Sequence, residues 1–134
     1  MNSPYSPPTL AGAWKTVIAG TQSPRLLIGD FVDDWRRYPD PVIREGLVRD
    51  PLTDVADDTL HRWGAFCAAM VEYLTVRDGV PTPTWVFADH WVLPTPWFLL
   101  PHWKMRAWLL VATPPPWKRR RIFGGDETMM IGRV

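Results

Sequence analysis

Proline is the residue that most constrains how this chain can fold. The 134 residues include fifteen prolines, more than twice the average usage of about 5%. Five of them lie between positions 81 and 101. Because proline fixes φ and has no backbone N–H to donate, it ends helices and is excluded from the interior of sheets. The pattern predicts short helices with irregular connections, and no long helix or central strand over 81–101.

Apolar residues between the prolines recur at helical spacing. The strongest pattern covers 57–79, with two aspartates at its start and Gly79 at its end, and it predicts a central helix. Weaker patterns predict further helices over 9–20, 23–41, 40–50, 102–113 and about 114–122, and a short helix or turn around 85–90. The segment 84–92 is the one candidate strand, at a sheet edge. The sequence therefore predicts an all-α fold: a compact single domain of five to seven short helices with a Pro/Trp-rich irregular segment.

Length and charge set the broad class of protein. Residues 1–8 are predicted to be a flexible Pro/Ser arm, and 9–134 a single helical domain. The net charge is +1, divided as −3 over residues 1–60 and +4 over 61–134, which falls short of the basicity of a dedicated nucleic-acid binder. The start resembles no signal peptide, and no apolar run approaches the ~18 residues of a membrane helix. We therefore expect a cytoplasmic protein with no membrane association.

The nine tryptophans fall into three predicted sets, of which the last two overlap. Those on apolar helical faces are expected in the core: Trp14, Trp35, Trp63 and Trp108. Three tryptophans of the Pro/Trp segment are expected to pack over the central helix: Trp85, Trp91 and Trp97. Four are free to be exposed: Trp91, Trp97, Trp103 and Trp117. An exposed aromatic patch suits a protein interface.

The sequence offers little support for catalysis. Cys67 lies on the apolar stripe of the central helix and is expected to be buried and inert. Asp89 and His90 are the candidate acid–base pair, although a turn histidine bonded to the backbone explains them better. No histidine is paired with another at a metal-ligand spacing, and no glycine-rich phosphate loop is present. The acidic clusters at 33–35 and 54–58 could suggest a metal site, but adjacent positions on a helix and a helix start explain them better. We expect a protein that is not an enzyme and that has no cofactor.

The stretch TPPPWKRRRIF, residues 113–123, contains four consecutive cations: Lys118, Arg119, Arg120 and Arg121. Thr113 and the prolines are suited to begin a helix, whose last turn favours positive charge. A helix here spreads the four cations around its axis. The cluster therefore has three candidate roles, which are contacts within the chain, contacts with a protein partner, and contacts with phosphate.

The second half of the chain resembles a small helical module of bacterial proteins. In order, the matching elements read VPTPTWV, LPTPWF and MRAWLLVATPPPWKRRRIF, and the chain ends in RV. The likeness covers residues 60–134 well and 24–59 loosely. The matching positions are Pro83, Trp85, Pro96, Trp97, Phe98, Arg106, Ala107, Thr113, Pro114, Trp117, Arg119, Arg120, Ile122 and Phe123. In antitoxin-like regulators this module typically follows a helix-turn-helix domain, and such regulators are often encoded beside a nucleotidyltransferase-like partner.

The resemblance implies a protein-interaction function. Residues 1–22 are too few for a helix-turn-helix domain, so it implies the interaction part without the DNA-reading part, and it supplies no catalytic residue. We expect an antitoxin-like or accessory subunit that restrains or assembles with a partner protein. Its partner-binding residues are predicted to be Trp97, Trp103, Trp117, Lys118, Arg119, Arg120 and Arg121. The alternative is a small nucleic-acid-associated protein in which Lys118–Arg121, with Lys104 and Arg106, contact phosphates while Trp103 or Trp117 stacks on bases.

Overall fold

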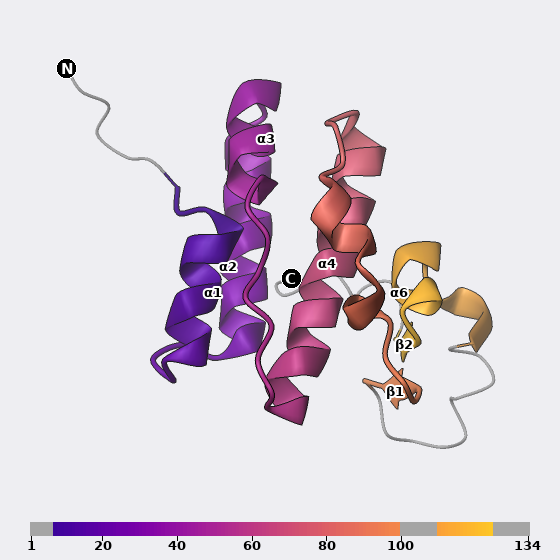
Figure 1. Ribbon diagram of the computed structural model, residues 1–134. Helices are drawn as coiled ribbons and strands as arrows, with labels where there is room; N and C mark the ends of the chain where they lie inside the picture. The colour runs from indigo at the N-terminus through magenta and orange to yellow at the C-terminus, as the bar shows by residue number, and fades with distance from the viewer. Residues whose placement is uncertain (1–6, 100–109, 125–134) are drawn as a thin grey trace.

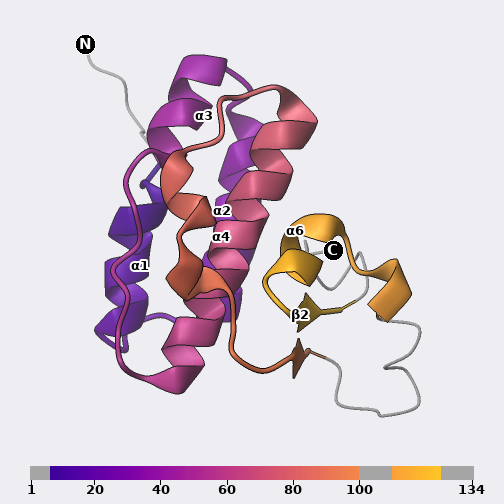
Figure 2. The same cartoon turned by 45° about the vertical axis from the view of Figure 1, so that its right-hand side comes forward.

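The computed structural model describes residues 7–99 and 110–124. The chain is predominantly α-helical, as its sequence predicts. The elements are α1 (Leu10–Ile18), α2 (Pro24–Arg37), α3 (Pro41–Val48), α4 (Asp58–Asp78), the 3₁₀ helices η1 (Thr84–Phe87) and η2 (Asp89–Trp91), β1 (Trp97–Phe98), α6 (Pro115–Arg119) and β2 (Ile122–Phe123). Helix α4 stands between α1–α3 on one side and α6 with the two short strands on the other (Figures 1 and 2).

Local sequence signals begin and end the first four helices. The side chains of Thr9, Ser23, Asp40 and Asp57 each accept a hydrogen bond from a backbone N–H in the first turn of α1, α2, α3 and α4 respectively. Such caps pair N–H groups that have no partner within the helix. Helix α4 ends at Gly79, whose φ of 71° is left-handed and therefore suits glycine.

The hydrophobic core forms around α4. Every residue of α4 from Gly64 to Thr75 is buried except Tyr73, and the core cluster reaches α1, α2, α3, η1, η2, α6 and β2. Trp14 and Trp35 are buried as predicted, whereas Trp63 is only partly buried. Trp108 lies outside the described residues.

At Gly64 the Pro/Trp segment packs tightly against α4. A Cβ at this position would lie 2.6 Å from Cζ3 of Trp91 and 3.3 Å from Cζ2 of Trp14. Both tryptophans are at most 1% exposed, so neither ring can move away freely. Trp91 therefore packs over the central helix as predicted, and glycine is what permits the contact.

We expect Gly64→Ala to lower the free energy of unfolding by about 1–3 kcal/mol, the usual cost of overpacking a core. Gly46→Ala in α3 is the matched control, because its nearest neighbour would be Nη2 of Arg49 at 3.8 Å. That variant should gain about 0.5–1 kcal/mol from the better helix propensity of alanine. Urea unfolding followed by circular dichroism measures both changes. Equal effects at the two glycines would contradict the close packing at Gly64.

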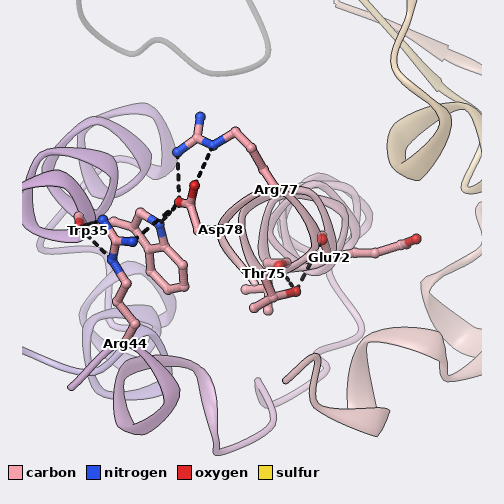
Figure 3. A network of polar contacts seen from close by, with 7 residues as sticks. Trp35, Arg44, Glu72, Thr75, Arg77 and Asp78 are labelled. Carbon is pink, nitrogen blue, oxygen red and sulfur yellow. Dashed lines mark hydrogen bonds and ion pairs between the residues drawn. The ribbon is translucent and has the colours of Figure 1, made fainter. Parts of the chain in front are cut away.

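A polar network fixes the end of α4 against α2 and α3 (Figure 3). The carboxylate of Asp78 accepts hydrogen bonds from Nε and Nη2 of Arg77, each at 3.0 Å, and from Nε1 of Trp35 at 2.6 Å. Arg44 of α3 lies 3.5 Å from the same carboxylate and donates to the backbone carbonyl of Trp35. The hydrogen bonds from Arg77, with the one from Trp35 and the charges of Arg77 and Arg44, hold the pKa of Asp78 below its ordinary value of 3.8.

This network should stabilise the fold in a pH-dependent way. The lowered pKa means that ionised Asp78 contributes stability above pH 3.8, and that this contribution is lost as the pH falls through the still lower pKa of the folded state. The destabilisation caused by Asp78→Asn should therefore be largest at neutral pH and should shrink in acid. Urea unfolding of both proteins over this pH range measures the difference.

Two comparisons isolate the effect of Asp78. Burial raises the pKa of Asp34, so total stability mixes opposing contributions, and only the difference between the variant and the wild type is informative. Asp50→Asn removes an exposed carboxylate and controls for the change in net charge. A difference for Asp78→Asn that is constant with pH would contradict the prediction.

The chain after α6 corrects one prediction from the sequence. We expected a helix over 114–122, but α6 ends at Arg119. Arg121 then adopts a left-handed φ of 66°, and Ile122–Phe123 pair in parallel with Trp97–Phe98. The helix stops because the next residues hydrogen-bond to a distant strand. The candidate strand at 84–92 is also wrong, since this segment forms η1 and η2.

Candidate interaction surface

The structure brings the Pro/Trp segment and the arginine cluster together. The backbone N–H of Leu93 donates to the carbonyl of Arg120 at 3.1 Å, and that of Trp97 donates to the carbonyl of Arg121 at 2.8 Å. A third bond joins Leu99 to Phe123 at 2.9 Å. Residues predicted to share a binding surface are therefore neighbours, although they lie far apart in the sequence.

Glu72 of α4 forms ion pairs with two of the four cations, Arg119 and Arg120. Its carboxylate is buried, and it accepts a hydrogen bond from Nη1 of Arg120 at 2.7 Å and another from Nη2 of Arg119. Figure 3 shows that the side chain of Glu72 points away from α4 on the side opposite the Asp78 network. A buried carboxylate requires a partner of opposite charge, and here α6 supplies that partner.

Arg120 is a structural residue. Its side chain is only 4% exposed, and it also donates to the backbone carbonyls of Val86 and Pro116, each at 2.6 Å. Burial, together with the nearby charge of Arg119, lowers the pKa of Arg120 to about 10. The guanidinium therefore remains charged at neutral pH, and it joins α4, η1 and α6 through one side chain.

Lys118 and Arg121, the first and last of the four cations, lie against backbone carbonyls and have no contact with Glu72 among those of the described residues. Arg121 donates from Nη1 to the carbonyls of Leu93 and Pro94, at 3.3 and 3.1 Å. Lys118 is exposed, and its Nζ lies 3.4 Å from the carbonyl of Val111. Arg119 is the member of the Glu72 group that reaches solvent, with 55% of its side chain exposed. The four cations thus do not form one flat patch.

The tryptophans are less accessible than predicted. Trp91 and Trp117 are 1% and 0% exposed, so the expectation that they are free to be exposed is wrong. Trp91 covers Gly64, and Trp117 packs on Phe66 and Tyr73 of α4. Trp97 of β1 is half-buried, and its ring lies edge-on to that of Trp63 of α4. Trp103 lies outside the described residues.

Exposed apolar side chains flank the arginine cluster instead. Phe87 and Val92 are 56% and 42% exposed, and both line a hollow of about 190 Å³. The hollow is completed by Val86, Ala88, Arg119 and Arg120. We call Phe87, Val92 and Arg119, with the hollow between them, the Phe87–Arg119 surface.

Helix η1 separates this hollow from a second, larger one. Trp85 lines a groove of about 500 Å³ whose other walls are Glu45, Val48, Arg49, Pro51, Pro81, Thr82, Pro83 and Thr84. The indole N–H of Trp85 donates to the carbonyl of Val48 at 2.9 Å, which fixes the ring against α3. Trp85 and Phe87, two residues apart, thus line different hollows.

The candidate acid–base residues are arranged differently from the prediction. Nδ1 of His61 lies 2.6 Å from Oδ1 of Asp54, so Asp54, rather than Asp89, orients a histidine. The rings of His61 and His90 both pack on Trp91. His61 lines a hollow of about 130 Å³, which is below the range of about 300–1,000 Å³ usual for small-molecule sites.

Two further expectations concern cysteine and metals. Cys67 is buried as predicted, and burial raises the pKa of its thiol to about 12, so it is a poor nucleophile. Residues 7–99 and 110–124 contain no group of three or more His, Cys, Asp or Glu side chains that could hold a metal ion.

Sequence reasoning overlooked Glu72, Phe87 and Val92. Glu72 did leave a signal, because it is the one charged residue between Arg62 and Arg77, within a helix that is apolar on nearly all sides. Such a helix is buried, so its single carboxylate needs a cation nearby. Phe87 left no comparable signal, since its exposure depends on the 3₁₀ turn that buries its neighbour Val86.

Comparison of the chain with protein-family models, with curated proteins and with solved structures finds no match. Within the described residues, no helix has both the length and the apolar character needed to cross a membrane.

Proposed function

We propose that this protein is a non-enzymatic interaction module that binds a partner protein through the Phe87–Arg119 surface. The observation that carries the proposal is the exposure of Phe87 and Val92 beside a half-exposed arginine. Apolar anchors close to arginine are characteristic of the residues that dominate binding at protein interfaces.

The size of the hollow also favours a protein partner. At about 190 Å³, it is smaller than the usual site for a small molecule or cofactor. It can instead hold one large apolar side chain from another protein. The resemblance to the antitoxin-associated module extends the proposal to an accessory subunit that restrains or assembles with a nucleotidyltransferase-like partner.

The charges argue against the alternative of phosphate binding. Arg120 is buried, and the three exposed cations each contact an oxygen of the chain: Arg119 pairs with Glu72, while Lys118 and Arg121 lie against backbone carbonyls. A phosphate-binding surface instead presents several exposed cations without such contacts along a backbone track. We therefore keep nucleic-acid binding as an outcome of the test and not as the proposal.

The test is a pull-down from the native host with the full tagged chain as bait, after nuclease treatment. Phe87→Ser is the informative variant. Val76→Ser is its control, because Val76 of α4 is also an exposed apolar residue, at 69%. We expect one protein to be retained by the wild type and by Val76→Ser, and to be lost from Phe87→Ser. Nucleic acid as the main species retained, released at high salt, would favour the alternative.

A further inference from the structure

Arg119 and Arg120 together carry one more positive charge than the carboxylate of Glu72 neutralises. The Glu72 carboxylate contacts both Arg119 and Arg120, which gives two guanidinium groups for one carboxylate. Among the residues described as lining the hollow, the charged ones are Arg119 and Arg120, and none is acidic. The surplus charge therefore lies at the rim of an apolar hollow.

The surplus charge belongs to the arginine that can move. Arg120 is 4% exposed and is held by two backbone carbonyls as well as by Glu72. Arg119 is 55% exposed, and Glu72 is its one ion-pair partner among the described residues. If Arg119 turned outward, Glu72 and Arg120 would remain a balanced buried pair. The structure thus contains an arginine that can leave its carboxylate without stranding a buried charge.

The charge of Arg119 is unfavourable for its neighbour. Its proximity is one of the reasons why the pKa of Arg120 is lowered. A carboxylate brought to Arg119 by another molecule would reduce this repulsion, and it could form the bidentate pair that arginine favours. Charge complementarity therefore selects an anionic group, and the adjacent Phe87 and Val92 select an apolar one.

We propose that the partner presents a short acidic segment in which an apolar side chain enters the hollow between Phe87 and Val92 while a neighbouring carboxylate takes Arg119 from Glu72. This inference rests on the proposed interaction function and specifies the chemistry of the partner. Glu72 holds Arg119 in the free protein, and the carboxylate of the partner replaces it in the complex.

A random peptide library displayed on phage, selected against the immobilised full chain, tests the proposal. We expect enriched peptides to contain a large apolar residue within a few positions of Asp or Glu. In fluorescence anisotropy, Arg119→Gln should weaken the binding of such a peptide roughly tenfold, as expected for the loss of a charge-assisted pair. Replacing the acidic residue of the peptide with its amide should weaken binding equally, and should have little further effect on Arg119→Gln.

Two variants control for general effects. Lys118→Gln removes an exposed neighbouring charge and should change the affinity less than about twofold. Phe87→Ser should abolish binding through loss of the apolar contact. The proposal is overturned if no peptide is enriched, if the enriched peptides lack acidic residues, or if Arg119→Gln binds as the wild type does. It is also overturned if the chain dimerises through this surface, as shown by sedimentation of the wild type and Phe87→Ser.

These outcomes can be separated from failure of the proposed function. A partner protein that is lost from Phe87→Ser in the pull-down, yet binds Arg119→Gln normally, would preserve the function and reject the acidic segment. Retention of the partner by Phe87→Ser would reject the surface itself.

Discussion

Glu72→Gln should lower the free energy of unfolding by about 3–5 kcal/mol, the usual cost of removing one member of a buried ion pair. The substitution keeps the shape of the side chain but leaves the guanidinium of Arg120 without a countercharge. Arg120 is only 4% exposed, so water cannot replace the lost carboxylate. Urea unfolding at neutral pH, followed by circular dichroism, measures the loss.

Arg119→Gln is the matched control, because Arg119 contacts the same carboxylate from a half-exposed position. Solvent screens this pair, so the variant should lose no more than about 1 kcal/mol. Similar losses for Arg119→Gln and Glu72→Gln would show that the buried pair does not dominate this part of the fold. The same measurement is a control for the binding experiment, because it shows whether Arg119→Gln is folded.

Replacing the whole pair separates charge from packing. The double variant Glu72→Leu/Arg120→Met removes both buried charges, which often restores stability. It also removes the donor to the carbonyl of Val86, and an unpaired buried carbonyl costs about 1–3 kcal/mol. We therefore expect the double variant to be more stable than Glu72→Gln but less stable than the wild type. A double variant as unstable as Glu72→Gln would mean that removing the stranded charge of Arg120 recovers no stability, which would contradict the prediction.

The predictable part of the fold is the part that local chemistry determines. Helices α1 to α4 follow from capping residues, apolar spacing and glycine or proline stops, all of which act within a few residues. The aspartates at 57 and 58 and Gly79 located the central helix correctly, because Asp57 caps its start and Gly79 its end in the structure. The burial of Cys67 followed from the same helical spacing.

The candidate site depends on contacts between residues that are far apart in the chain. Glu72 meets Arg119 and Arg120 across 47 and 48 residues, and no periodic pattern encodes that pairing. The parallel pairing of 97–98 with 122–123 ends α6 early, although the local sequence suits a longer helix. Tertiary hydrogen bonds outweighed local propensity there. Trp117, which composition alone could not assign to the core or the surface, is buried by packing on Phe66 and Tyr73 of α4.

Trp117→Ala should lower the free energy of unfolding by about 3–5 kcal/mol, as is typical for deleting a buried tryptophan. The indole is fully buried and packs on Phe66 and Tyr73 of α4, with ring centroids 5.5 and 5.3 Å apart. Its loss would leave a cavity between α4 and α6. Because Arg120 lies three residues further along the chain, the same change should loosen the ion pair with Glu72.

Trp117→Phe is the informative companion, because it keeps an aromatic ring but removes the indole N–H. The part of the chain that the structure describes offers that N–H no hydrogen-bond acceptor, and a buried unpaired donor costs about 1–3 kcal/mol. Relief from this cost should offset part of the lost packing, so Trp117→Phe should destabilise the protein much less than Trp117→Ala. Urea unfolding of the two variants in parallel measures the difference. Equal destabilisation would mean that the indole N–H has a hydrogen-bond partner in solution. The tryptophan would then stabilise the fold through that bond as well as through its packing on α4.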